Sequence, residues 1–116
     1  FDIVKLAIAA GATYVARSTT YHPQQMIKLF KRAIEHKGFS VVEVFSQCPT
    51  YYGRTNRKGD AVEMMSFYKE HAVKAGSDAK AEDPFRFEIG EFVCEDRPEF
   101  CQGYAEMAGE LGEAER

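Results

Sequence analysis

The sequence lacks any apolar run that approaches the roughly 18 consecutive residues needed for a membrane-spanning helix. Its start also lacks the positively charged stretch and short apolar core of a secretory signal. Apolar residues make up 45% and charged residues 28% of the chain, which is ordinary for a globular domain. These features predict a cytoplasmic protein that does not bind a membrane.

Cysteine is scarce, and Cys48, Cys94 and Cys101 are the three thiols of the chain. An odd number of cysteines without a secretory signal argues against a disulfide scaffold and indicates reduced thiols in a reducing compartment. No two of them form a Cys-x-x-Cys pair, and the spacing of Cys94 and Cys101 does not indicate zinc.

The chain also has no excess of positive charge, since its formal net charge is −3. Residues 1–77 hold 11 Lys or Arg and 6 Asp or Glu, a balance of +5. Residues 78–116 hold 4 Lys or Arg and 12 Asp or Glu, a balance of −8. The acidic last third argues against nucleic-acid binding, and a length of 116 residues allows one domain at most.

The first 45 residues alternate between helix and strand patterns. Residues 2–10 predict a helix that is capped by Asp2, ended by Gly11 and largely buried. A short strand over 13–17 and a helix over 23–36, which begins at Pro23, follow. Residues 39–45 are almost continuously apolar, as in a strand covered on both faces. This order predicts an α/β fold in which a helix joins two adjacent parallel strands, with helices flanking the sheet.

The second half predicts three more elements. Asp60 and Glu63 have the spacing of a capping box and predict a helix over 61–75, with Val62, Met65, Tyr68 and Ala72 facing inward. In residues 85–93 apolar and polar side chains alternate, as in a strand with one solvent-exposed face, and Gly90 is a candidate bulge. From residue 96 the pattern fits an amphipathic helix whose last residues we expect to fray.

The predicted core is small for a parallel sheet, because three strands are visible and the chain opens at Phe1 directly in an apolar helix. We expect a piece of a longer chain; the alternative is a trimmed small domain. An exposed strand edge and exposed apolar residues such as Ile3, Ile8 and Phe30 should then make the piece associate rather than persist as a monomer.

The loop from Ser46 to Arg54 is the best candidate site. It leaves the C-terminal end of the strand over 39–45, where open α/β sheets bind ligands. Cys48 is the soft metal ligand or nucleophile in it, and Tyr51 and Tyr52 add apolar rings with polar tips. From the residues alone, a small buried hydrophobe is the commoner role for a free cysteine. A functional thiol stays open beside it.

Other polar residues have ordinary structural interpretations. Three histidines lie at or beside helix ends, where capping, solvent exposure or dipole pairing is usual: His22, His36 and His71. A small basic cluster follows the loop and is either a solvated turn or a contact to an anion or a partner subunit: Arg54, Arg57 and Lys58. No role follows from the sequence for Cys94 or Cys101.

Three segments carry a family resemblance: KLAIAAGATYVAR, HKGFSVVEVFSQCPTYYGR and GDAVEMM. Over about residues 1–75 they resemble the C-terminal half of 2-oxoacid:ferredoxin oxidoreductase beta subunits, and SQCPTYYGR looks more like the 2-oxoglutarate branch than the pyruvate branch. The resemblance implies that 1–77 is the C-terminal half of a thiamine-diphosphate-binding domain. It implies a linker, an edge strand and a C-terminal helix for 78–116.

The resemblance also implies cofactors and partners. Cys48 would be one of four cysteines that hold a [4Fe–4S] cluster beside thiamine diphosphate and Mg²⁺. The other three ligands and the Gly-Asp-Gly segment for Mg²⁺ are absent from this sequence, so we expect the piece to be inactive alone. The implied partners are an alpha subunit, ferredoxin, coenzyme A and a 2-oxoacid. Two alternatives are a non-catalytic α/β interaction module and a thiol enzyme with Cys48 as nucleophile.

Overall fold

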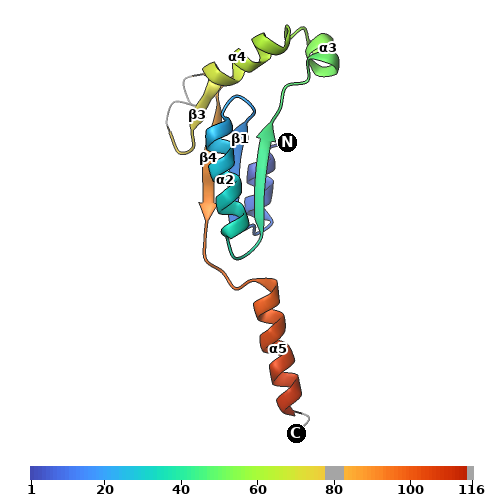
Figure 1. Cartoon of the computed structure of the whole chain (residues 1–116), viewed down its shortest axis with the longest axis vertical. Helices are drawn as coiled ribbons and strands as arrows, with labels where there is room; N and C mark the ends of the chain where they lie inside the picture. Colours follow the sequence, from blue (N-terminus) through green and yellow to red (C-terminus); the bar gives the residue numbers. More distant parts are fainter. Residues whose placement is uncertain (78–82, 115–116) are drawn as a thin grey trace.

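The computed structural model describes residues 1–77 and 83–114, which form one four-stranded sheet with helices around it (Figure 1). The elements are α1 (Ile3–Ala9), β1 (Tyr14–Thr19), α2 (Pro23–Glu35), β2 (Ser40–Phe45), a π-helical turn η1 (Pro49–Gly53), α3 (Arg54–Asn56), α4 (Ala61–His71), β3 (Ala72–Lys74), β4 (Phe87–Cys94) and α5 (Phe100–Ala114). The α/β class predicted from the sequence is confirmed.

The strand order is β2-β1-β4-β3. β1 and β2 are parallel over their whole length, with Tyr14 opposite Ser40 and Thr19 opposite Phe45, as the sequence predicted. β4 runs antiparallel to β1 and parallel to β3, so the sheet is mixed rather than purely parallel. The strand predicted at an edge, β4, is paired on both sides. The domain boundary at residues 77 and 78 stays a prediction.

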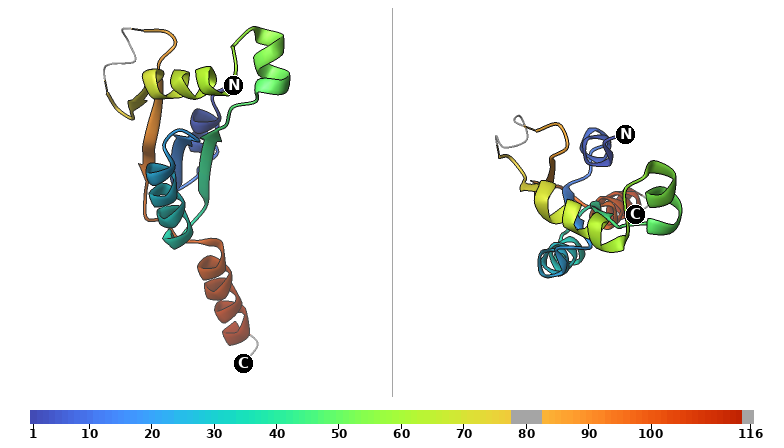
Figure 2. Two further views of the ribbon diagram at one scale, coloured as in Figure 1. Left: turned by 45° about the horizontal axis from the view of Figure 1, so that its top comes forward. Right: turned by 90° about the horizontal axis from the view of Figure 1, so that it is seen from above.

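α1 and α2 cover opposite faces of the sheet (Figure 2). Because side chains alternate along a strand, Val15 packs against Val4 of α1, while Tyr14 and Ala16 pack against Leu29 of α2. Every residue of β1 is buried, whereas β2 lies at the edge of the sheet and is only half-buried. The prediction that both faces of β2 are fully covered is therefore wrong for this chain.

The helix ends follow the predicted local chemistry. The carboxylate of Asp2 accepts a hydrogen bond from the Lys5 backbone N–H at 3.4 Å and caps α1. Gly11 follows α1 with a φ of +89°, in the left-handed region that glycine tolerates. Pro23 is the first residue of α2. The predicted burial of α1 is wrong, since Leu6 is exposed and Val4 is its buried residue.

The helix predicted over 61–75 is shorter in the structure. α4 begins after Asp60, whose capping box with Glu63 is present, and ends at His71. Residues 72–74 form β3 instead, because pairing with β4 overrides the weak helical preference there. The inward face also differs from the prediction, since Met64 is buried and Val62 is exposed.

The bulge expected in β4 is present two residues after the glycine. Val15 pairs with Val93 and Ala16 pairs with Glu91, which leaves Phe92 as the extra residue of β4. Gly90 precedes it with a φ of +119°. The linker expected from residue 77 on falls mostly on 78–82, outside the described residues.

Much of the apolar surface is uncovered. Ile3, Ile8 and Phe30 are exposed as expected for a partial core, and α5 extends from one end of the sheet (Figure 1). The principal extents are 69 × 32 × 26 Å. No helix in the described ranges is long and apolar enough to cross a bilayer. The expected self-association stays a prediction.

A buried cation ties four elements together. The side chain of Arg17 on β1 donates from Nη2 to Asp2 Oδ1 at 2.7 Å and from Nε to Glu43 Oε2 on β2 at 2.6 Å. The guanidinium carbon lies 5.1 Å from the ring centroid of Phe45 and 5.5 Å from that of Phe92. A planar guanidinium suits this position, because its edge can bind carboxylates while its faces stack on aromatic rings.

This network generates the first prediction. Arg17→Met keeps an unbranched apolar side chain but leaves Glu43 and Asp2 without their cation. We expect the free energy of unfolding to fall by about 3 kcal/mol, the low end for a broken buried ion pair, because both carboxylates keep some contact with water. Urea denaturation followed by circular dichroism at one protein concentration measures it.

Lys5→Met is the matched control, since Lys5 is an exposed partner of the same Asp2 at 4.0 Å. Its effect should be close to zero. In the double variant Arg17→Met/Glu43→Leu no unpaired Glu43 remains, so part of the lost stability should return. Equal losses for Arg17→Met and Lys5→Met would contradict the proposed role of the network.

Candidate functional site at the carboxyl end of β2

The parallel strands β1 and β2 end side by side, and the Cys48 loop leaves from this edge. The hydroxyl of Thr20, just after β1, donates to Gln47 Oε1 at 2.6 Å and lies 3.4 Å from Met65 Sδ on α4. The Thr20 N–H also donates to the Phe45 carbonyl at 3.0 Å. These bonds hold the first residues after β2 against the end of β1, so the loop starts from a defined position.

The Cys48 thiol is exposed and lies at the start of the turn η1. Its pKa is lowered chiefly by the backbone N–H of Tyr52, with smaller contributions from Tyr51 and Thr50, and slight desolvation acts in the opposite direction. Amide donors that point at the sulfur stabilise the thiolate, which is the form that binds metals and attacks electrophiles. The role of a small buried hydrophobe is therefore wrong for Cys48 in this chain.

Gly53 is the buried residue of this loop and lets it fold tightly on α4. Its N–H donates to the Cys48 carbonyl at 2.9 Å, and its own carbonyl accepts from the Lys58 N–H at 2.9 Å. A Cβ at this position would lie 3.1 Å from Met64 Sδ and 3.3 Å from the Gly59 carbonyl oxygen. The absence of a side chain thus allows the loop and α4 to close around the space beside Cys48.

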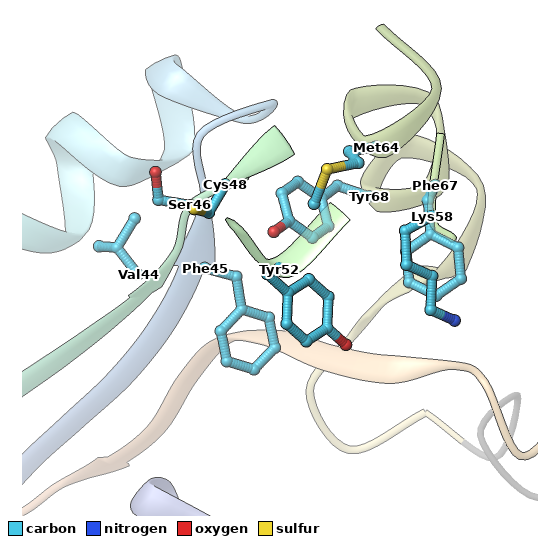
Figure 3. A pocket seen from close by; sticks show the side chains of 9 residues that line it. All are labelled: Val44, Phe45, Ser46, Cys48, Tyr52, Lys58, Met64, Phe67 and Tyr68. Carbon is cyan, nitrogen blue, oxygen red and sulfur yellow. The ribbon is translucent and has the colours of Figure 1, made fainter. Parts of the chain in front are cut away.

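That space is a cavity of about 530 Å³ between the end of β2, the loop and α4 (Figure 3). Its walls are mainly apolar and aromatic, and the lining residues are Val44, Phe45, Ser46, Cys48, Tyr52, Lys58, Met64, Phe67 and Tyr68. Burial raises the pKa of the Tyr68 hydroxyl, which keeps that group neutral. A cavity with apolar walls and a few polar groups is typical of a ligand site.

The basic cluster is divided by the local fold. Lys58 lines the cavity, whereas Arg54 and Arg57 do not. Among the described residues, none of the three side chains makes an ion pair. Arg57 has a φ of +54°, a left-handed conformation that ends α3 and turns the chain toward Lys58.

The histidines keep structural roles in the described part of the chain. His22 bonds to the Thr19 hydroxyl at 2.8 Å, and His36 bonds to the Thr13 hydroxyl at 2.9 Å. His71 bonds to the Phe67 carbonyl at 3.0 Å within α4. Because no described histidine contacts Cys48, the pairing of nucleophile and base that a thiol enzyme needs is absent from these residues.

Cys94 and Cys101 lie far from the cavity, on β4 and α5, and both are free and exposed. The described residues contain no group of three or more His, Cys, Asp or Glu that could hold a metal ion. A metal site that used Cys48 would therefore need its remaining ligands from outside these residues.

The sequence analysis found only part of the wall that α4 contributes. Met64, Phe67 and Tyr68 line the cavity from this helix, and of these only Tyr68 was predicted to face inward. The spacing of three and four residues indicates a common helix face, which the choice of Val62 and Met65 obscured. Arg17 was likewise placed only as part of a strand, and nothing local in the sequence marks its two carboxylate partners.

Comparisons with known proteins show what this chain is similar to. Residues 1–44 match the family described as thiamine pyrophosphate enzyme, C-terminal TPP binding domain. The 2-oxoglutarate synthase subunit KorB of Methanocaldococcus jannaschii is 46% identical over 104 residues, which are 87% of this chain and 38% of that subunit. The chain is homologous to the beta subunits of 2-oxoacid:ferredoxin oxidoreductases. The family resemblance drawn from the sequence is thereby confirmed.

Further relatives extend the comparison. KorB of Methanothermobacter marburgensis is 47% identical over 105 residues, 87% of this chain and 36% of that subunit. The 2-oxoacid:ferredoxin oxidoreductase 2 beta subunit of Aeropyrum pernix is 48% identical over 48 residues, 41% of this chain and 16% of its own length. The chain thus spans less than half of the relatives it matches.

One solved structure shares the fold. The 2-oxoglutarate:ferredoxin oxidoreductase of Magnetococcus marinus, solved with 2-oxoglutarate, coenzyme A and succinyl-CoA bound, has a TM-score of 0.75 with this chain. The match covers 97% of this chain and 40% of that one at 24% identity. At 24% identity this likeness is evidence for a shared fold alone.

The lowered thiol pKa generates the second prediction. In the 116-residue chain without a bound cluster, iodoacetamide should modify Cys48 faster than the exposed Cys101 at neutral pH, because backbone donors lower the pKa of the Cys48 thiol. As the pH rises above the ordinary thiol range, the ratio should fall toward one. Mass spectrometry of the labelled peptides over time gives both rates, and equal rates at neutral pH contradict the prediction.

Proposed function

We propose that this chain is the C-terminal part of the beta subunit of a 2-oxoglutarate:ferredoxin oxidoreductase, which converts a 2-oxoacid and coenzyme A to an acyl-CoA and CO₂. The reaction releases two electrons, which are transferred to ferredoxin. One observation carries the proposal: a free, acidified Cys48 thiol lies beside an aromatic cavity at the carboxyl end of a parallel strand, in a chain homologous to such beta subunits.

Cys48 fits the role of an iron ligand. Iron–sulfur clusters are held by thiolates, and hydrogen bonds to the sulfur tune the reduction potential. The backbone donors from Tyr52, Tyr51 and Thr50 lower the thiol pKa and would favour the bound, deprotonated form. The other three ligands of a [4Fe–4S] cluster belong to the part of the subunit outside this sequence.

The described residues do not form a site for Mg²⁺ and the diphosphate, because they contain no acidic cluster suited to the ion. When bound in the intact enzyme, thiamine diphosphate supplies an electron sink for decarboxylation and the cluster supplies a one-electron relay. The segments that bind Mg²⁺ and the diphosphate are therefore assigned to the missing part of the subunit.

The chain's own contribution is the wall of the cavity. Phe45, Tyr52 and Phe67 bring apolar rings into a space beside the exposed Cys48 thiol (Figure 3). Apolar walls with a few polar groups are typical of a site that binds a ligand. Lys58 supplies a positive charge at this wall, which favours an anionic ligand.

The alternative, a non-catalytic interaction module, is supported only by the uncovered apolar faces. It gives no reason for hydrogen-bond donors aimed at Cys48 or for a cavity beside it. The beta-subunit assignment accounts for both features and also implies an alpha subunit and ferredoxin as partners.

The third prediction tests the cluster ligand. Cys48→Ser in the intact subunit should abolish cluster absorbance or make it unstable, since a hard alkoxide replaces a soft thiolate. Ferredoxin reduction should fall by more than roughly 100-fold, because even outer-shell partners of a metal cost up to that much. Visible absorbance, electron paramagnetic resonance and ferredoxin reduction are measured on the same preparations.

Cys101→Ser is the control, because Cys101 is a free, exposed thiol on α5, away from the cavity. It should retain full cluster content and turnover. A Cys48→Ser enzyme with the same absorbance and rate as this control would remove Cys48 from the cluster.

The fourth prediction concerns the substrate. The intact enzyme should use 2-oxoglutarate with a kcat/KM at least roughly tenfold above that for pyruvate, a modest discrimination for one additional charged group. The motivation is the SQCPTYYGR segment and the identity of 44–47% to three KorB subunits of 2-oxoglutarate synthases. Steady-state rates on both acids decide it, and a preference for pyruvate contradicts the assignment.

A further inference from the structure

Three hydroxyl side chains follow one another at the end of β1, and they bond in two directions. The hydroxyls of Ser18 and Thr19 bond to side chains at the start of α2, at 3.1 and 2.8 Å. The Thr20 hydroxyl instead donates to Oε1 of Gln47 at 2.6 Å. Gln47 directly precedes Cys48, so Thr20 is the hydroxyl of this group that connects the sheet to the Cys48 loop.

The bond to Thr20 restrains the chain just before Cys48. Gln47 is half-buried, whereas its neighbours Ser46 and Cys48 are exposed. The Thr20 N–H also donates to the carbonyl of Phe45 at 3.0 Å. Thr20 therefore holds the chain on both sides of Ser46. Because a side chain bonded at its tip limits the backbone rotations of its own residue, the peptide that leads into Cys48 is held as well.

The chain after Cys48 is restrained from α4. The Gly53 N–H donates to the Cys48 carbonyl at 2.9 Å, and a Cβ on Gly53 would lie 3.1 Å from Met64 Sδ. Met64 lines the same cavity as Cys48 (Figure 3). Met65, the next residue of α4, has its Sδ 3.4 Å from the Thr20 hydroxyl oxygen. Two successive residues of one helix thus lie against the two restraints that flank Cys48.

We propose that Thr20 is a positioning residue for Cys48: through Gln47 its hydroxyl fixes where the sulfur lies when it binds a metal cluster. The inference rests on the proposed function, in which Cys48 is a cluster ligand. The backbone N–H groups of Tyr51 and Tyr52 point at this sulfur. A shift of the Cys48 backbone would weaken these hydrogen bonds, which tune the reduction potential of a bound cluster.

Thr20→Val in the intact subunit is the direct test, because valine keeps the branched shape but leaves the Gln47 oxygen without its donor. An iron chelator should remove cluster iron roughly tenfold faster, the low end for the loss of an outer-shell partner. The reduction potential should fall, since hydrogen bonds to the sulfur stabilise the more negative, reduced cluster. Thr20→Ser keeps the hydroxyl and should retain the original values of both.

Thr19→Val is the matched control. It removes the neighbouring hydroxyl, which is fully buried and bonds to His22 at the start of α2. This variant should lower the melting temperature of the subunit but leave iron release and the reduction potential unchanged. A general loss of stability would therefore not imitate the result expected for Thr20→Val.

Gln47→Met removes the same hydrogen bond from the loop side and leaves the end of β1 unaltered. It carries the test if Thr20→Val does not fold. Its effects should match those of Thr20→Val, and the double variant Thr20→Val/Gln47→Met should show no further change. Such non-additivity is expected when two substitutions remove one shared interaction.

Unchanged iron release in both Thr20→Val and Gln47→Met would overturn the proposal, and so would an equal effect of Thr19→Val. Cys48→Ser separates this failure from that of the proposed function. If Cys48→Ser loses the cluster while Thr20→Val and Gln47→Met keep the original values, Cys48 remains the ligand and only the role of Thr20 is wrong. If Cys48→Ser keeps the cluster, both assignments are wrong.

Discussion

The rest of the structure depends on the burial of one cation inside the sheet. Arg17 lies on the fully buried strand β1, and a guanidinium there is tolerated only because two carboxylates and two aromatic rings surround it. Its partners come from the cap of α1 and from the neighbouring strand β2, and the rings come from β2 and β4. One side chain therefore holds α1 and three strands in a single arrangement, including the antiparallel strand that follows α4 and β3 in the chain.

This arrangement positions the candidate site. Arg17 pairs with Glu43 in the β1–β2 register, so the end of β2 is held beside the end of β1. Thr20 then bonds to Gln47 and contacts Met65, which joins the loop start to α4. The cavity beside Cys48 forms where these three elements meet. Its chemistry thus rests on a loop held at both ends, with the sheet on one side and α4 on the other.

Local rules predicted the elements whose causes are local. The Asp2 cap, Pro23 at the start of α2 and the capping box of Asp60 each act within one helical turn, and all are present. The apolar strand before the Cys48 loop and the position of that loop at a strand end were predicted for the same reason. Errors arose where distant segments compete, as in residues 72–74, which pair with β4 instead of extending α4.

The sequence by itself determined the alternation of helices and strands, the α/β class and the likeness to oxidoreductase beta subunits, because periodicity and motifs are read along the chain. Tertiary structure alone decided which side of α4 faces the cavity, where Met64 replaces Val62, and which carboxylates meet Arg17. It also decided that β4 is inserted between β1 and β3. The physical reason is that strand order and side-chain partners are set by contacts between residues far apart in sequence, and such contacts leave no mark on the local pattern.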